Sequence, residues 1–462
     1  MNTILICQKS YAFTVLQTES QPQHLACKNI VINSHLPRSK NFYYGWVISG
    51  TFAVTFGITY GTMSSFGIFF KPLSADLEVS RTLASLAPSL TWTTINCSAP
   101  LWGLVADKWS ARIVTATCGI LIGLGWFLSG TVTSAWQLYL FFGCLLGIGM
   151  GGIGPPLVGL TSRWFTYQRG LALGIGFAGL GVAIIFISPL ASWLVETYGW
   201  RSGMQGFAFL TCGIISLGSL LLRQPPVDTS DIHHQSQAPK VTRTPSSHTT
   251  LQPLGRQKPE LTAMQAIWSV PFLLLSLMWF AATLAIAQVV VHLVPRITDL
   301  GITATHGALI LSLIGFVSSI GKAGGGFLGD KIGPEKAFCL SMLLKAAALL
   351  WLLFATSLWM FFPFAVAFGL SWGGFTPQVA NIMGRIFGLR HMSTLYGALW
   401  LGGGMGGVVG PLLAGWVFDV TGSYSLAFIL AAALSVLVAG LPFLVREPRV
   451  KPDRKNSSGL IT

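Results

Sequence analysis

Charged side chains are scarce in this chain of 462 residues. Asp, Glu, Lys and Arg together make up 9% of it, whereas 52% of the residues are hydrophobic. A soluble domain carries roughly a quarter charged residues, so this composition cannot supply the surface of a soluble protein. With a mean hydropathy of +0.66, the scarcity of charge indicates a protein that lies in a lipid bilayer.

Acidic residues are especially few. The chain has 14 of them, and none lies in the middle of an apolar stretch long enough to span a membrane. Carboxylates are the usual partners of cationic substrates and common members of proton relays inside membranes. Their absence argues against an exporter of organic cations or of multiple drugs. A membrane-embedded enzyme is also disfavoured, because it would need a cluster of His, Asp or Glu inside the spans.

Cysteine is present in an odd and scattered set of seven, which argues against a disulfide framework or a metal cluster. The adjacent His233 and His234 are interpreted as solvated side chains rather than metal ligands. The run from Gly315 to Lys322 lacks the spacing of a phosphate loop, and Ala323 stands where a magnesium-binding Ser or Thr is required. We therefore expect no metal, no cofactor and no use of ATP.

What the chain does have is a repeat. A set of Pro, Asp, Gly and Arg positions recurs about 223 residues later, and such a constant offset does not follow from shared composition. The chain is therefore two copies of one unit, and parallel halves of this kind are a transporter architecture. The matching pairs are Pro72 and Pro295, Asp76 and Asp299, Gly103 and Gly326, Asp107 and Asp330, and Arg163 and Arg385.

Each unit contains about six apolar stretches that could cross a hydrocarbon core of ~30 Å as helices. The fold class expected is an all-α membrane protein with twelve transmembrane helices in two parallel six-helix repeats. The spans are predicted near residues 46–70, 83–105, 113–132, 136–160, 171–195, 203–222, 268–294, 305–328, 337–356, 359–384, 393–418 and 424–445.

The segments outside the spans divide the chain further. The stretch 1–41 has neither an apolar run of helix length nor a cleavage site, so it is interpreted as a tail and not a signal peptide. The polar stretch 223–265 is too poor in apolar residues to form a core and is interpreted as a flexible linker. The expected divisions are an N-terminal tail 1–43, halves 44–222 and 266–445 joined by the linker 223–265, and a basic tail 446–462.

The net charge of +14 is distributed unevenly. With an even number of spans, 22 of the 28 Lys and Arg fall on the side of the two termini and four on the other side. By the positive-inside rule the side of the termini is cytoplasmic. The asymmetry explains the net positive charge without a nucleic-acid partner. It also predicts a multi-pass protein of the plasma membrane with both termini in the cytoplasm.

A charged turn motif follows the second predicted span and recurs after the eighth. The copies are Gly103-Leu-Val-Ala-Asp107-Lys108-Trp-Ser-Ala-Arg112 and Gly326-Phe-Leu-Gly-Asp330-Lys331. The motif resembles the loop signature of the major facilitator superfamily, although a lysine and a serine replace an arginine and a glycine of that signature in the first copy. The resemblance implies twelve helices and transport by alternating access.

An Asp in such a turn can accept hydrogen bonds from the free N–H groups at the start of a neighbouring helix. We expect Asp107 to face the start of the eleventh span near Ser393, and Asp330 the start of the fifth near Gly170. Making and breaking these contacts would bias which side is closed. The residues assigned to gating are Asp107, Lys108, Arg112, Arg163, Asp330, Lys331 and Arg385.

Longer segments narrow the resemblance to the bacterial relatives of the monocarboxylate transporters. These segments are Tyr44-Gly45-Trp46, Ser65-Phe-Gly-Ile-Phe-Phe-Lys-Pro72, Ser162-Arg-Trp-Phe165, Val291-His-Leu-Val-Pro295 and Gly415-Trp-Val-Phe-Asp419. The likeness covers about residues 43–445, and the combination is more specific than any one piece. It implies a secondary transporter of small organic acids.

Lys322 is the principal candidate for binding the substrate. The resemblance implies that it stands where these transporters have an arginine for the substrate carboxylate, while Ser318 replaces an acidic residue tied to proton coupling. Lysine cannot form the bidentate fork of arginine, but a buried lysine can release its proton and so couple a proton without a carboxylate. Snorkelling toward the membrane surface is the alternative for Lys322, and it is the interpretation we favour for Lys345.

Other polar residues are weaker candidates. His292 could carry a proton, because imidazole gains and loses one near physiological pH, or it could be a packing residue. Amides and hydroxyls on helices expected to line the cavity could orient a small acid, or could bind helix to helix. The substrate-binding candidates of this kind are Tyr60, Asn96, Gln288, Gln378 and Asn381.

The number of cations bears on the substrate. Within the resemblance, Ser64 and Gly403 stand where related carriers have a further lysine, so a single cation favours a monoanion such as lactate or pyruvate over a dianion such as oxalate. The function predicted is a secondary transporter of a small organic monoanion, with or without a coupled proton. The alternatives are an exchanger of the oxalate/formate kind, a carrier of another solute, and a non-transporting nutrient sensor on the same fold.

Overall fold

The computed structural model describes residues 43–78, 80–226 and 262–445. The predicted tail 446–462 and nearly all of the tail 1–43 and the linker 223–265 lie outside the described residues. At the end of the predicted linker, Thr262 caps the short helix α10 (Ala263–Ile267), and the Gln265 side chain accepts a hydrogen bond from the Thr262 backbone in return. Residues 263–265, the last three of the predicted linker, are therefore helical, because a capping box is a local helix signal that composition does not register.

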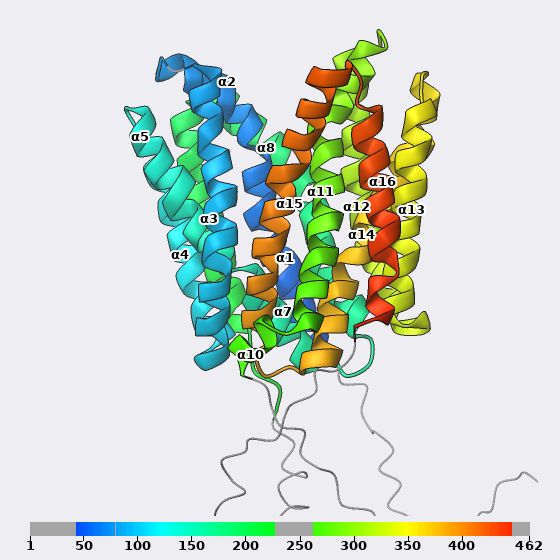
Figure 1. Cartoon of the computed structure of the whole chain (residues 1–462). Helices are drawn as coiled ribbons and strands as arrows, with labels where there is room; N and C mark the ends of the chain where they lie inside the picture. Colours follow the sequence, from blue (N-terminus) through cyan, green and yellow to red (C-terminus); the bar gives the residue numbers. More distant parts are fainter. Residues whose placement is uncertain (1–42, 79, 227–261, 446–462) are drawn as a thin grey trace, which may run out of the picture. The chain divides into compact units, whose positions relative to one another are not determined.

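The first half is built from helices that cross the bundle in alternating directions (Figure 1). These are α1 (Gly45–Ser64), α2 (Phe66–Asp76), α3 (Arg81–Lys108), α4 (Ala111–Ser129), α5 (Ala135–Leu138), the π-helix η1 (Tyr139–Leu146), α6 (Gly147–Gly151), α7 (Gly154–Trp164) and α8 (Arg169–Leu221).

The second half follows α10 and has fewer interruptions. Its elements are α11 (Val270–Asp299), α12 (Ala304–Ile332), α13 (Pro334–Phe354), α14 (Leu358–Phe387), α15 (Met392–Thr421), α16 (Ser425–Ala439) and a 3₁₀ turn, η2 (Leu441–Phe443). The described residues contain no strand.

These elements make twelve membrane crossings, as predicted. Ten segments are long and apolar enough by themselves to span a bilayer. The 28 residues of α3 supply another crossing, about 42 Å long at 1.5 Å per residue, although Ser and Thr lower its hydropathy. The 53 residues of α8 would measure about 80 Å, and Gly199 breaks this helix at φ +80°, so α8 supplies two crossings.

Two predicted spans are interrupted helices. The first crossing changes course at Ser65, between α1 and α2. The fourth passes through η1 and breaks again at Gly152 and Ile153 before α7 begins. The second break follows from the sequence, because Pro155 and Pro156 cannot donate backbone hydrogen bonds and are tolerated only in the first turn of a helix.

The two halves meet where glycine allows backbones to approach. A Cβ atom on Gly103 of α3 would collide with the backbone of Ser393 in α15, and one on Gly326 of α12 would collide with the backbone of Gly170 in α8. Gly103 and Gly326 are repeat-related, so the same contact is made twice. Both lie near the C-terminal ends of their helices, at the end of the bundle where Figure 1 shows α7 and α10, which we call the lower end.

Candidate functional site

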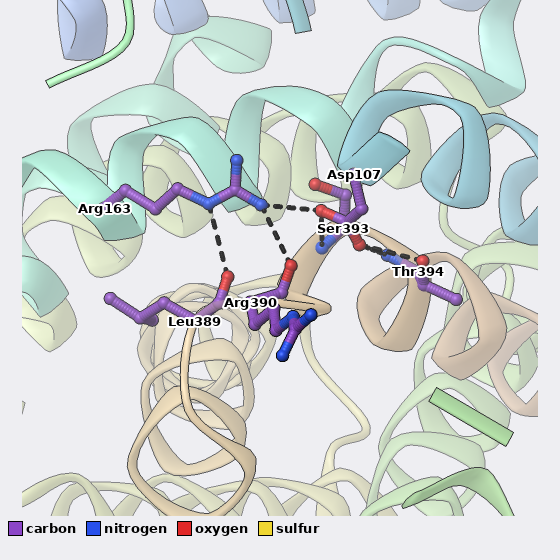
Figure 2. A network of polar contacts seen from close by, with 6 residues as sticks. All are labelled: Asp107, Arg163, Leu389, Arg390, Ser393 and Thr394. Atoms are coloured by element: carbon purple, nitrogen blue, oxygen red, sulfur yellow. Dashed lines mark hydrogen bonds and ion pairs between the residues drawn. The ribbon is translucent and has the colours of Figure 1, made fainter. Parts of the chain in front are cut away.

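Asp107 caps a helix that belongs to the other half. The residue before α15, His391, gives that helix no side-chain cap. The Asp107 carboxylate instead accepts the backbone N–H of Thr394 at 2.8 Å, that of Ser393 at 3.3 Å and the Thr394 hydroxyl at 2.8 Å (Figure 2). The Asp107 side chain is only 4% exposed, so these bonds replace water for a charge at the positive end of the α15 dipole.

Asp330 makes the repeat-related contact. Its two carboxylate oxygens each accept one backbone N–H at 2.8 Å, from Gly170 and from Leu171 of α8. Gln168, which precedes α8, has a left-handed backbone (φ +37°) and provides no side-chain cap. Both helix-start contacts expected from the sequence are therefore present, and each half completes one helix of the other. Whether they govern gating remains a prediction.

Arg163 of α7 joins the Asp107 contact to the loop before α15. Its guanidinium donates to Asp107 Oδ1 at 2.7 Å, to the Leu389 carbonyl at 3.2 Å and to the Arg390 carbonyl at 3.3 Å (Figure 2). The two carbonyls belong to the second half, whereas Arg163 and Asp107 belong to the first. The guanidinium thus joins the two halves as well as neutralising Asp107.

The second copy departs from this pattern. Arg385, the counterpart of Arg163, pairs with Glu335 at 3.5 Å rather than with Asp330. Both partners are substantially exposed (49% and 30%), so the pair contributes little to stability. Arg169 lies against Gly384 on the Asp330 side instead. Arg169 directly precedes the capped residues Gly170 and Leu171 and was not among the residues predicted for the site.

The other basic residues assigned to gating lie on the surface. Lys108 and Arg112 are exposed, and no ion pair joins either to another described residue. Lys331 is exposed as well, with its Nζ 4.4 Å from the centre of the Phe327 ring. In this conformation these three side chains do not join the contacts between the halves, which are made by the two carboxylates and Arg163.

We call the contacts of Asp107 and Asp330 with helix starts of the other half the trans-caps. They predict an effect on hydrogen exchange that does not depend on any substrate. Asp107→Ala should speed exchange of the Ser393 and Thr394 amides by roughly fivefold, since removing a helix cap costs about 1 kcal/mol. Peptide-resolved hydrogen–deuterium exchange measures this directly. Lys108→Ala, at the exposed neighbour, is the matched control and should leave residues 392–395 unchanged. Equal exchange in wild type and Asp107→Ala would show that the contact does not hold α15 closed.

Lys322 lies inside the bundle. Its side chain is on α12, only 5% of the residue is exposed, and no hydrogen bond or ion pair joins its ammonium group to another described residue. Phe316 and Ile320, on the opposite face of α12, are about half exposed (51% and 54%), so α12 turns its lysine inward and its large apolar side chains outward. A snorkelling lysine would keep its head group in water, and that alternative does not fit this position.

Lys345 corrects a prediction. The expectation that it snorkels from a peripheral helix is wrong, because the residue is completely buried. Its Nζ donates to the Ala282 carbonyl of α11 at 3.2 Å and lies 4.3 Å from the centre of the Phe375 ring on α14. Helix α13 packs on α14, α16 and α12, and it turns the face that carries Lys345 toward the bundle while Leu340 and Trp351 lie exposed on its outer side.

An aromatic cluster crosses from one half to the other. The Tyr60 and Trp400 rings are 6.1 Å apart, those of Phe177 and Tyr396 are 6.2 Å apart, and Tyr396 is 6.1 Å from Trp279. We call these five residues the aromatic cluster. Tyr60 and Phe177 come from the first half, and the other three come from the second.

The Trp400 indole nitrogen faces the Tyr396 hydroxyl within the aromatic cluster. The Tyr396 hydroxyl and the Trp400 indole nitrogen are buried and make no hydrogen bond with good geometry to any described residue. Such groups are costly to bury unpaired, and both can donate to an anion. The Lys322 backbone meets Gly174 of α8, and Phe177, three residues further along α8, lies against the Tyr396 ring.

Of the predicted binding residues, Tyr60 belongs to the cluster and Asn96 lies at the contact between the halves. The Tyr60 hydroxyl donates to the Met150 carbonyl at 3.3 Å. The Asn96 amide donates to the Trp92 carbonyl at 2.7 Å, and its side chain packs on Gly404 of α15. Both side chains are therefore placed where movement of the halves would reach them.

The other predicted amides lie within the second half. Gln378 donates to the Gly325 carbonyl at 2.6 Å and so joins α14 to α12, which is the packing role of an intramembrane amide. Gln288 of α11 is fully buried, and neither its oxygen nor its nitrogen has a partner among the described residues. Asn381 is buried on α14, near the lower end, with no hydrogen bond to another described residue.

His292 is placed between two helices. Its Nε2 lies 3.0 Å from the Pro411 carbonyl of α15, and its ring is 5.0 Å from that of Tyr424. These contacts are what the packing alternative requires. They leave the imidazole far along α11 from Trp279, thirteen residues away or about 20 Å at 1.5 Å per residue.

Two further observations concern what the site can hold. A Cβ on Gly403 would collide with the Trp279 indole, so this position has no room for the second lysine of related carriers. A groove of about 430 Å³ lies between α1 and α8, but side chains such as Ala53, Ile58 and Phe186 make its lining apolar. It suits lipid chains better than an organic anion.

Comparisons with known proteins agree with this geometry. The model of the Major Facilitator Superfamily matches residues 52–325 and 294–461. The chain is 27% identical over 407 residues to monocarboxylate transporter 13 of Rattus norvegicus, covering 88% of this chain and 89% of that one. It is 26% identical over 431 residues to monocarboxylate transporter 11 of Homo sapiens, covering 89% and 84%.

Solved structures show the same fold. A Major Facilitator Superfamily transporter, FucP, in the outward conformation superposes with a TM-score of 0.67 at 14% identity, covering 87% of this chain and 100% of that one. A variant of the E. coli fucose:proton symporter superposes with a TM-score of 0.65, also at 14% identity.

Proposed function

Because this chain belongs to the Major Facilitator Superfamily and is similar over most of its length to monocarboxylate transporters, we propose that it carries a small organic monoanion across the membrane by alternating access. The favoured substrates are monocarboxylates of the size of lactate or pyruvate. In this proposal the lower end is the cytoplasmic one, in line with the excess of Lys and Arg on that side.

The observation that carries the proposal is that Lys322 is buried and has no ion-pair partner among the described residues. A buried cation with no carboxylate beside it is unfavourable in the empty protein, and an anion from solution would remove that cost. The Tyr396 hydroxyl and the Trp400 indole N–H offer further donors. Apolar rings around these donors suit a short acid with one charge, since a second carboxylate would lack a partner.

The described conformation supplies one state of the cycle. The trans-caps of Asp107 and Asp330 hold the lower end closed, so the substrate enters from the opposite side. The proposed switch breaks both caps, and the starts of α8 and α15 then separate from α12 and α3. Because each cap is a charged group on a helix start, water can replace it at modest cost, which keeps the two states close in free energy.

Transport by the wild-type protein tests the proposal. We expect purified protein in liposomes to take up radiolabelled L-lactate and pyruvate, and an inward pH gradient to increase the accumulation. Unlabelled lactate should compete, whereas a quaternary ammonium cation should not. Oxalate should be a poor substrate.

The outcomes separate the alternatives. Exchange of oxalate for formate without any effect of pH would favour an anion exchanger instead. If none of the four acids (lactate, pyruvate, formate and oxalate) moves while the protein is folded and inserted, the assigned substrate class is wrong, and a carrier of another solute or a sensor becomes the better reading.

A further inference from the structure

Lys345 is a second buried cation, and the proposed function does not use it. An ammonium group has three N–H donors, but Lys345 has one acceptor among the described residues, the Ala282 carbonyl at 3.2 Å. The Phe375 ring gives partial compensation from its face. Two of the three N–H donors of this fully buried residue therefore have no acceptor among the described residues, which is costly for a charged group.

No acidic side chain lies beside Lys345. On α13 itself, Glu335 and Lys336 are ten and nine residues away, about 15 Å along the helix. On the packed helices α11 and α14, the nearest titratable groups, His292 and Arg385, are likewise ten residues beyond Ala282 and Phe375. The remaining titratable or charged groups described on these helices and on α12 and α16 are Arg296, Asp299, His306, Lys322, Asp330, Lys331, Cys339 and Tyr424.

Of these groups, Lys322 is linked to Lys345 through α14. Lys322 Nζ lies 5.9 Å from the centre of the Trp372 ring, and Lys345 Nζ lies 4.3 Å from that of Phe375, one helical turn further on. Two positive charges in an interior of low polarity repel each other. A charged Lys322 therefore disfavours a proton on Lys345, and an anion bound at Lys322 removes that repulsion.

We propose that Lys345 is the residue that couples a proton to the anion. This inference rests on the proposed function of Lys322 as the anion site. Binding of the anion favours protonation of Lys345, and by reciprocity a protonated Lys345 favours binding of the anion. The carrier thereby couples a proton without an acidic residue beside either lysine.

The step balances as a symport. The lone pair of the Lys345 amine takes one proton from the outer solution while the monoanion occupies Lys322, and both leave on the cytoplasmic side. One positive and one negative charge cross together, so the cycle moves no net charge. Since Lys345 has no contact with solvent in this conformation, the proton can reach it only when α11 or α14 moves against α13.

Lys345→Met tests the inference, because methionine fills a similar unbranched volume without a titratable group. For a gradient of one pH unit, a one-to-one symporter sustains about tenfold accumulation of lactate. We expect wild type and Lys336→Met, an exposed lysine on the same helix, to approach that value. Lys345→Met should equilibrate lactate without concentrating it, yet keep lactate–lactate exchange within about twofold of wild type.

A second measurement follows protons directly. In weakly buffered detergent solution, lactate binding should take up roughly one proton per anion in wild type and none in Lys345→Met. Lys345→Gln replaces the methionine variant if that protein does not fold. Full accumulation by Lys345→Met, or binding to wild type without proton uptake, would overturn the inference while leaving the proposed function standing. Absence of lactate binding to wild type would overturn both.

Discussion

Lys322→Ala is expected to lower the initial rate of L-lactate uptake by at least about 100-fold. The variant leaves the substrate carboxylate without its charged partner in a buried site, a change that costs about 3–5 kcal/mol when a buried ion pair is broken. Each 1.4 kcal/mol is a factor of ten in affinity, so the loss should fall between roughly 100-fold and 4,000-fold. Initial rates in proteoliposomes at low lactate concentration measure it.

Two further variants make this result specific. Lys336→Ala removes an exposed lysine at the start of α13 and should transport as wild type does. Lys322→Arg keeps the charge with a larger head group, and it should retain measurable uptake because guanidinium also binds carboxylates. Uptake by Lys322→Ala within twofold of wild type would show that Lys322 does not bind the substrate.

Gly326→Val should lower the rate of lactate uptake by at least about 50-fold. A side chain at this position meets the backbone of Gly170 and Leu171 rather than a movable side chain, so α8 and α12 cannot close at the lower end. A carrier that loses one of its two closed states cannot complete a cycle. A change of a few kcal/mol in the free-energy difference between the two states is enough to depopulate one of them. Uptake assays and hydrogen exchange at residues 169–172 measure both consequences.

Gly324→Val is the matched control, two residues away on α12. A Cβ at Gly324 meets nothing within 4 Å, so the same substitution there should leave uptake within about twofold of wild type. It also accounts for the effect of valine on the helix itself. Equal loss in both variants would mean that α12, and not its contact with α8, is sensitive to the change.

The repeat allowed much of the fold to be predicted. A constant offset between landmarks gave two halves and twelve crossings, and the paired motifs of Asp107 and Asp330 gave the helix starts that they cap. These inferences succeeded because a short motif with a fixed chemical partner constrains where the partner must be. The breaks at Ser65 and Gly199 depend on local backbone geometry, which periodicity alone does not resolve.

The surroundings of the buried lysines could not be predicted in the same way. The hydropathy of a span does not say which face of the helix is turned inward, so Lys345 was assigned to the membrane surface although it is completely buried. The aromatic cluster was also missed, because its five rings come from separate helices that no local pattern connects. Tyr396 and Trp400 share one face of α15, four residues apart, and that spacing was the only available signal.

The reciprocal capping of α8 and α15 bears on the ancestry of the chain. Each carboxylate satisfies a helix that it does not belong to, and the two contacts are related by the duplication. In a two-fold symmetric dimer, any contact from one copy to the other is automatically made a second time in return. The arrangement is what a six-helix protein would inherit if it first worked as a pair of identical subunits and its gene was later joined to its own copy. The different partners of Arg163 and Arg385 would then reflect divergence of the two halves after the duplication.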